Sequence, residues 1–217
     1  MAKMIDKKPS WKGEGKVWES LSTNLPGDNV VYNQREVNGR EYDFCVMAEN
    51  LGLVIIEVKG WDSDKIDVRG VDNIIVEGYD EPQTSPKKQA RAYRFAILNK
   101  IVEKYNVSPL VLDMVCYPFI TQEQYIKTKL DIVSEPEYTI FKEDIEDGEK
   151  LNEKIQHLFT RNKFIPHADF SYDLLVRIRK QLEPEFELSV VDDQNKPYSK
   201  ISIFPNDINE KIGRAHV

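Results

Sequence analysis

Hydrophobic side chains recur at three- and four-residue intervals in several parts of the chain, which is the spacing of a buried helix face. The first such segment runs from Gly13 to Leu25, and Pro26 ends it because proline does not fit a helix interior. A longer helix is predicted from Ser85, a good capping residue, to Tyr105, with a proline in its first turn. Two shorter amphipathic helices are predicted in LNEKIQHLF and SYDLLVRIRKQL.

Other segments have the patterns of β-strands. Two runs, NVVYNQREV and REYDFCVMAE, flank the turn dipeptide Asn38-Gly39 and are predicted to form a hairpin. The runs LGLVIIEVKG and PLVLDMVCYPFI are apolar on both faces, which is typical of strands in the middle of a sheet. We also expect a short strand in EYTIFK, a hairpin at 65–78, and short strands after residue 183 on either side of a turn or linker at 192–197. This order of elements predicts an α/β fold, with a mixed central sheet flanked by helices and additional helices toward the C-terminus.

The composition is that of an ordinary globular chain. With 217 residues, of which 41% are hydrophobic and 31% charged, we expect one domain with at most a small appendage. No run approaches the roughly 18 consecutive apolar residues of a membrane-spanning helix, and the first residues lack the apolar core of a signal peptide, so we expect a cytoplasmic protein with no membrane partner. Cys45 and Cys116 lie inside apolar runs and are predicted to be buried free thiols.

The last six residues are unlike the end of a domain. Residues 212–217 read IGRAHV, which is also the translation of a common sequencing-adapter sequence, and we interpret them as an artefact rather than as a polar tail. The natural chain is therefore expected to continue differently after about residue 211. We divide the rest into a core at 10–145 and, at 146–211, a helical extension or the start of a linker to a missing domain.

Charged side chains are predicted to converge where the apolar strand LGLVIIEVKG ends. If this strand and the preceding one turn around Asn50, paired residues have numbers that sum to about 100, which sets Asp43 opposite Glu57. Lys59 follows Glu57 by two residues and therefore points to the same face. Facing carboxylates in a buried place are costly unless a cation neutralises them, and oxygen ligands favour Mg²⁺ or Mn²⁺. A salt bridge on an edge strand, with no metal ion, is the alternative.

This spacing resembles the signature of the PD-(D/E)xK nuclease superfamily, with Tyr42 where the family has proline. The resemblance implies a restriction-endonuclease-like core in which Asp43, Glu57 and the backbone carbonyl of Val58 hold the metal ion. Lys59 would orient or activate the attacking water. The chemistry suits phosphodiester hydrolysis, because a divalent ion and a nearby ammonium group both stabilise the charge that builds on phosphoryl oxygens.

Further residues resemble the nuclease-related domain, NERD, over roughly residues 10 to 125. That family adds a glutamate in the first helix and a later glutamine, which correspond here to Glu14 and Gln89. The resemblance implies a metal-dependent nuclease that hydrolyses DNA, with Glu14 as a further metal ligand and Gln89 as a substrate-positioning residue. It also implies a fused helicase or other module in the missing part of the protein. For Glu14, the alternative is an acid favoured by the helix dipole.

Two basic segments adjoin this site, although the whole chain carries a net charge of -7. Eight acids lie within residues 135–153, whereas residues 1–16 and 85–104 are basic, and we interpret these two segments as a phosphate track for single-stranded or branched DNA. The alternatives are a solvated helix face for the cations and core packing for the aromatic residues. The predicted nucleic-acid contacts are Lys12, Lys16, Trp61, Lys87, Lys88, Arg91, Tyr93 and Arg94.

Two other functions are compatible with these residues. A non-catalytic nucleic-acid-binding or scaffolding module of a helicase-type protein would keep the fold and the basic helix. A sugar or nucleotide metabolic enzyme would carry the tripeptide Glu57-Val58-Lys59 by chance. A scaffold has no need for a costly acidic cluster, so Asp43, Glu57 and Lys59 favour the nuclease over the scaffold.

Overall fold

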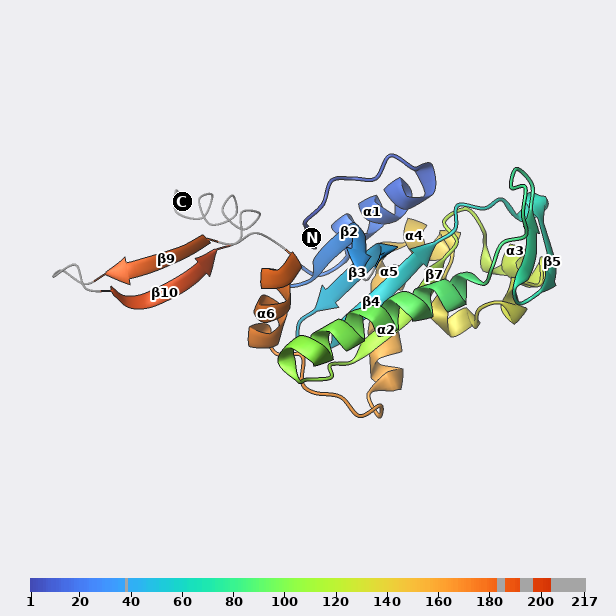
Figure 1. Ribbon diagram of the computed structural model, residues 1–217. Helices are drawn as coiled ribbons and strands as arrows, with labels where there is room; N and C mark the ends of the chain where they lie inside the picture. Colours follow the sequence, from blue (N-terminus) through green and yellow to red (C-terminus); the bar gives the residue numbers. More distant parts are fainter. Residues whose placement is uncertain (38, 183–185, 192–196, 204–217) are drawn as a thin grey trace. The chain divides into compact units, whose positions relative to one another are not determined.

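The computed structural model describes residues 1–37, 39–182, 186–191 and 197–203 of the chain (Figure 1). The chain divides into two compact units, Met1–Phe170 and Ser171–Val217. The first unit holds the predicted core and extends past residue 145, because the helix that begins at Gly148 contributes Leu151 and Ile155 to the same hydrophobic cluster as the sheet. The predicted turn at 192–196 and the predicted artefact at 212–217 lie outside the described residues.

Within the described residues, six strands form one mixed sheet in the order β1-β2-β3-β4-β7-β8. The three consecutive strands β2, β3 and β4 are antiparallel, whereas β1 pairs with β2, β7 with β4, and β8 with β7 in parallel. Their bounds are Lys3–Met4 for β1, Val30–Val37 for β2, Arg40–Ala48 for β3, Gly52–Val58 for β4, Val111–Cys116 for β7 and Thr139–Ile140 for β8. The predicted α/β fold with a mixed central sheet is confirmed, and it is consistent with a restriction-endonuclease-like core.

Two helices begin and end where the sequence predicts. α1 covers Lys12–Asn24, and α2 covers Pro86–Tyr105, with the Ser85 side chain accepting a hydrogen bond from the Lys88 amide at the N-terminus. The remaining helices are α3 (Gln122–Lys127), α4 (Lys142–Glu146), α5 (Gly148–Asn162) and α6 (Tyr172–Leu182), with short 3-10 turns η1 (Ser63–Lys65), η2 (Leu130–Ile132) and η3 (Pro136–Tyr138).

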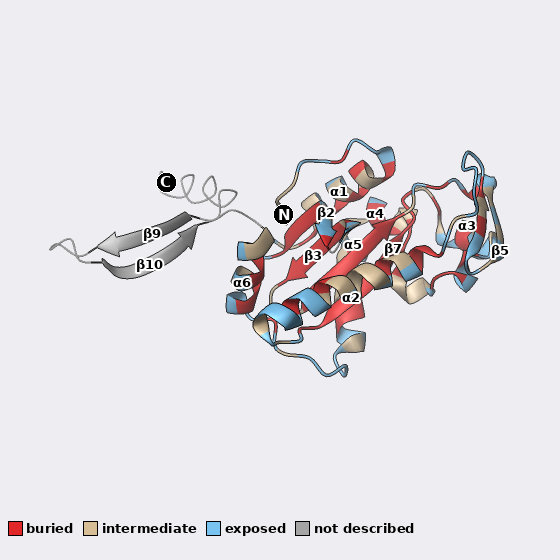
Figure 2. Ribbon diagram, viewed as in Figure 1, coloured by how far each residue is buried: buried red, intermediate tan, exposed pale blue. Residues whose placement is uncertain are grey.

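The two faces of the sheet are covered by different helices. Phe44, Val46 and Ile56 share one face and pack in a cluster with α1 and α5, whose buried residues include Leu21 and Ile155. Because side chains alternate along a strand, Cys45, Ile55 and Glu57 lie on the opposite face, which α2 crosses (Figure 1). β4 is buried along its whole length, as Figure 2 shows for the centre of the sheet.

Two hairpins complete the described strands. β5 (Ile66–Gly70) pairs with β6 (Asn73–Val76) as predicted, and in the second unit β9 (Phe186–Val191) pairs with β10 (Pro197–Ile203). Cys45 and Cys116 are buried free thiols, as expected, and burial raises the pKa of the Cys45 thiol to about 12. In the part of the chain that the structure describes, the helices are too short or too polar to span a membrane.

Candidate active site

The turn between β3 and β4 has the predicted register. Phe44 pairs with Ile56 and Ala48 with Gly52, so the partner numbers sum to 100. Asn50 lies at the turn with a φ of 62°, a left-handed conformation that asparagine tolerates better than most residues. The next step of the register beyond Phe44 and Ile56 places Asp43 opposite Glu57, as the sequence predicts.

Glu57 is a nearly buried carboxylate with incomplete hydrogen bonding. It is 4% exposed, and the Lys59 Nζ donates to its Oε1 at 2.7 Å. Its Oε2 is buried and has no hydrogen-bond partner among the described residues. Asp43 is held differently, because its Oδ2 accepts the Val58 amide hydrogen at 2.6 Å. The strand end therefore holds two carboxylates and one ammonium group.

The three acids at this strand end have raised pKa values. Burial, followed by repulsion from Asp43, raises the pKa of Glu57 to about 7, although Lys59 opposes both effects. Burial also raises the pKa of Asp43, against the Val58 amide and Lys59, which lower it. The pKa of Glu14 is raised by burial and then by Asp43. One lysine does not balance this group of acids, so the cluster favours a further cation.

Glu14 reaches this cluster because the start of α1 lies close to the end of β4. A Cβ added at Gly13 would lie 3.2 Å from the Gly60 Cα and 3.3 Å from the Pro118 Cγ, which is a tight contact, so the close approach favours glycine. Glu14 is in the first turn of α1, where the helix dipole also favours an acid. Its Oε2 accepts a hydrogen bond from the Gln34 Nε2 at 2.9 Å.

Gln34 is a site residue that the motif alone does not indicate. The pairs Asn33–Phe44 and Arg35–Tyr42 flank it, which sets Gln34 opposite Asp43 on the neighbouring strand. Its φ of 51° is unusual within a strand. The signal was available in the sequence, because the hairpin turn at Asn38-Gly39 fixes the register of β2 and β3 in the same way that Asn50 fixes that of β3 and β4.

The donor set of the cluster fits a hard divalent cation, but the carboxylates are not gathered around one point. Among the residues that the structure describes, no three His, Cys, Asp or Glu side chains are close enough together to hold a metal ion. Glu57 is held by Lys59, Asp43 by the Val58 amide and Glu14 by Gln34. The unpartnered Oε2 of Glu57 and the raised pKa values favour occupation by a cation. The ligand set Asp43, Glu57, Val58 carbonyl and Glu14 stays a prediction.

Two of the predicted nucleic-acid contacts on α2 point into the protein. Lys87 is 7% exposed, and its Nζ lies 3.0 Å from the Asp113 Oδ2. The Arg94 Nη1 lies 2.8 Å from the Asp113 Oδ1. Their interpretation as a phosphate track is corrected, because both cations neutralise a buried aspartate of β7. The sequence carried the signal, since Lys87, Ala90 and Arg94 continue the spacing of the buried residues on this helix.

Trp61 is also corrected, from a base-stacking residue to a core residue. It is 4% exposed, and its ring lies 6.0 Å from that of Tyr117, which starts a chain of aromatic contacts through Tyr125 to Phe141. The β5–β6 hairpin covers this cluster with Ile74 and Val76. A residue buried in this way offers no ring face to a nucleobase.

The other predicted residues of α2 border a groove of about 580 Å³. Its lining includes Gln89 and Tyr93, on one face of the helix, and Glu41, which is two residues before Asp43 on β3. The Gln89 side chain donates to the Thr84 Oγ1 at 2.9 Å. The Lys88 ammonium forms an ion pair with Asp72 at the tip of the β5–β6 hairpin. Arg91 is exposed and forms no ion pair with the described residues.

Lys12 and Lys16 lie near the start of α1, beside Phe119. Their Nζ atoms are 5.5 Å and 5.9 Å from the centre of the Phe119 ring, and Lys16 also pairs with Glu146 at 2.9 Å. Neither lysine is buried. The structure thus brings the Lys12 and Lys16 cations to the same end of the sheet as Glu14.

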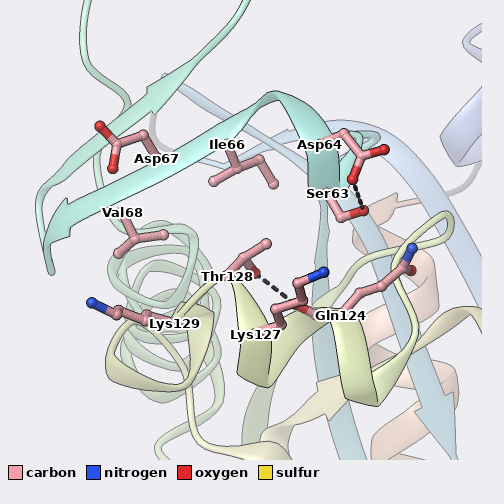
Figure 3. A pocket seen from close by; sticks show the side chains of 9 residues that line it. All are labelled: Ser63, Asp64, Ile66, Asp67, Val68, Gln124, Lys127, Thr128 and Lys129. Carbon is pink, nitrogen blue, oxygen red and sulfur yellow. Dashed lines mark hydrogen bonds between the residues drawn. The ribbon is translucent and has the colours of Figure 1, made fainter.

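A separate hollow of about 320 Å³ lies between β5 and α3 (Figure 3). Acidic side chains from the hairpin side, Asp64 and Asp67, meet Lys127 and Lys129 across it, and the Thr128 Oγ1 donates to the Gln124 carbonyl at 2.9 Å. None of the predicted site residues lines this hollow. The unbalanced acids are instead at the end of β4.

The mixed sheet and its Asp43, Glu57 and Lys59 cluster define a protein of the restriction-endonuclease-like class. Residues 9–118 match the family model of NERD, the nuclease-related domain, which covers just over half of the chain. The chain belongs to this family. No curated protein and no solved structure matched the chain.

Proposed function

We propose that this chain is a metal-dependent nuclease that hydrolyses the phosphodiester bonds of DNA. The observation that carries the proposal is the buried Glu57, which faces Asp43 and has one oxygen without a partner among the described residues. A folded protein gains nothing in stability from such an arrangement, because burying like charges together costs free energy. The nuclease-related family supplies the reaction class.

Each side chain of the cluster has a proposed task. Asp43, Glu57 and the Val58 carbonyl would hold Mg²⁺ or Mn²⁺, with Glu14 as a further ligand. When bound, the ion would lower the pKa of a coordinated water and offset charge on the scissile phosphate. Lys59, whose Nζ is 2.7 Å from Glu57, would orient that water and stabilise the same charge. Gln89, with Lys88, Arg91 and Tyr93 beside it on α2, would position the strand.

One assay tests the proposal directly. The protein is incubated with labelled single- and double-stranded DNA and Mg²⁺ or Mn²⁺, beside Asp43→Ala, Lys59→Ala and the control Lys65→Ala. Lys65 follows the same strand in the sequence and is exposed, with its Nζ 3.9 Å from the Glu77 Oε1. We expect Asp43→Ala and Lys59→Ala to lose about a hundredfold or more of the cleavage rate, as when a charge-stabilising group is removed. Lys65→Ala should cleave at the wild-type rate.

Metal binding has its own measurement, independent of cleavage. Adding Mg²⁺ or Mn²⁺ should raise the melting temperature of the wild-type protein but not that of Asp43→Ala, because a ligand that binds only the folded state stabilises it. Cleavage that survives both Asp43→Ala and Lys59→Ala would overturn the proposal. DNA binding without cleavage would instead favour a non-catalytic scaffold, the role expected of a module that loads a linked helicase.

A further inference from the structure

An aromatic and basic groove lies at the N-terminus of α1. It has a volume of about 380 Å³, and its lining includes Pro9, Trp11, Lys12, Lys16 and Phe119. Trp11 is 72% exposed. The indole therefore presents a large, rigid aromatic surface to solvent at the edge of this groove.

The local structure does not explain why a tryptophan is at position 11. It occupies the N-cap position of α1, where Ser, Thr, Asp or Asn would stabilise the helix, and its side chain makes no capping hydrogen bond. Its neighbour Lys12 is exposed and forms no ion pair with the described residues. The groove therefore offers an exposed tryptophan beside an exposed lysine, whose Nζ lies 5.5 Å from the centre of the Phe119 ring.

Phe119 connects this groove to the proposed active site. The edge of its ring, at Cε2, lies 3.6 Å from where a Cβ would stand on Gly13 and also 3.6 Å from where one would stand on Gly60. Gly60 directly follows Lys59, and Gly13 directly precedes Glu14. A strand whose phosphate lies at Lys59 would reach the groove with a neighbouring nucleotide.

We propose that this groove binds an unpaired nucleotide of single-stranded DNA next to the scissile phosphate, with the base stacked on Trp11 and the phosphate held by Lys12. The inference rests on the proposed function, which it deepens by naming the form of the substrate. Stacking on an aromatic side chain requires a free base face, and bases inside a duplex have both faces covered by their neighbours. The protein therefore prefers a single strand or a single-stranded tail to a continuous duplex.

Binding is measured without divalent ions, so that cleavage plays no part. Fluorescence anisotropy of a labelled 12-nucleotide oligo(dT) is recorded in EDTA with the full chain. We expect Trp11→Ala to weaken binding about tenfold, as for loss of one base stack, and Trp11→Phe to keep most of the affinity. Lys12→Ala should flatten the dependence of log K on log salt by about 0.7, the value for one single-strand phosphate contact.

Phe164 provides a matched control. It is 83% exposed and stands beside a lysine in the same way, with the Lys163 Nζ 5.2 Å from the centre of its ring. Phe164 and Phe119 are near opposite ends of β7. Phe164 shortly precedes Ala168, which forms a β-bridge with Pro109 just before this strand, whereas Phe119 follows the end of the strand. Phe164→Ala should bind oligo(dT) like the wild type.

Two further oligonucleotides separate stacking from charge. An oligonucleotide with abasic sites keeps its phosphates but has no bases to stack. The wild type should therefore bind it about tenfold more weakly than oligo(dT). The Trp11→Ala variant should bind both oligonucleotides equally. A blunt duplex of the same length should bind more weakly than oligo(dT).

The outcomes distinguish the inference from the nuclease proposal. If the protein cleaves DNA but Trp11→Ala binds oligo(dT) like the wild type, or if the wild type fails to bind it, the groove inference is wrong and the nuclease proposal stands. If binding depends on Trp11 but no cleavage occurs with Mg²⁺ or Mn²⁺, the groove inference holds and the nuclease proposal fails. Circular dichroism checks that each variant is folded.

Discussion

Glu57 and Asp113 are both buried carboxylates on neighbouring strands of the same sheet, but they differ in how many cations surround them. Asp113 meets two cations of α2, with the Lys87 Nζ and the Arg94 Nη1 at 3.0 Å and 2.8 Å. Glu57 shares the single cation Lys59 with Asp43, and its Oε2 has neither a hydrogen bond nor an ion pair among the described residues. The Asp113 Oδ2 also accepts no hydrogen bond, but it lies 3.0 Å from the Lys87 Nζ. Since β4 and β7 pair in parallel, with Ile55 beside Asp113, both acids lie on the face that α2 crosses.

This difference distinguishes a structural ion pair, at Asp113, from a site at Glu57 that needs a further proton or cation. A buried charge is tolerated when the chain itself supplies the counter-charge, as at Asp113. Where the chain supplies too little, the pKa rises and the acid binds a proton or a cation, as at Glu57. The burial of an acid is therefore less informative than the number of cations around it.

The largest effect is expected from removing Asp113. Asp113→Ala leaves Lys87 and Arg94 facing each other without their shared acid, so the free energy of unfolding should fall by about 3 to 5 kcal/mol. Urea denaturation at pH 7 measures this change. The comparison fails if Asp113→Ala is as stable as the wild type, because Asp113 would then not be the buried anchor of these cations.

A smaller and opposite effect is expected at Glu57, and it depends on pH. The folded pKa of about 7 is above the ordinary value of 4.5, so the folded state holds the proton more tightly than the unfolded state. Stability from this group is present below about pH 4.5 and is lost as the pH rises through 7. In EDTA, the free energy of unfolding of Glu57→Gln should therefore rise relative to that of the wild type as the pH increases over this range. The expected gain is about 3 kcal/mol at pH 8.

The measurement is a pair of urea titrations, of wild type and Glu57→Gln, at pH 4.5 and pH 8. The quantity compared is the difference in the free energy of unfolding between the two proteins, and how this difference changes from pH 4.5 to pH 8. Other groups titrate in both proteins, so their effects cancel in this difference. If the difference is independent of pH, Glu57 is as well compensated as Asp113, and the contrast between the two acids disappears.

The smallest effect is expected at Lys88, next to Lys87 on α2. Lys88 pairs with Asp72 on the surface, where solvent screens the attraction, so Lys88→Ala should leave the urea midpoint unchanged. Lys87→Ala, which strips a buried cation from Asp113, should lower it. Binding of oligo(dT) sharpens the distinction, because Lys88→Ala should weaken it modestly and flatten its salt dependence.

The sequence by itself determined the four longest helices, the central strands and the carboxylate cluster of the site, but it did not indicate the short helices α3 and α4. A turn at Asn50 and the two-residue period of a strand are local rules, and they are sufficient to bring Asp43, Glu57 and Lys59 together. The caps of α2 follow from Ser85 and Pro86 for the same reason. These features depend on residues close together in the chain, whose geometry the backbone fixes.

The tertiary structure alone decided which charges are free. Lys87 and Arg94 both form ion pairs with Asp113 of β7, and the number of cations along α2 does not predict this. The pairing depends on how the helix packs on the sheet. Likewise, Glu14 joins the cluster only because Gly13 and Gly60 pack closely. Trp61 is buried by contacts with residues far away in the sequence, such as Tyr117, whereas Trp11 remains exposed. The spacing along α2 indicates which face of the helix is buried, but the partner and the charge balance of each side chain depend on how the elements pack together.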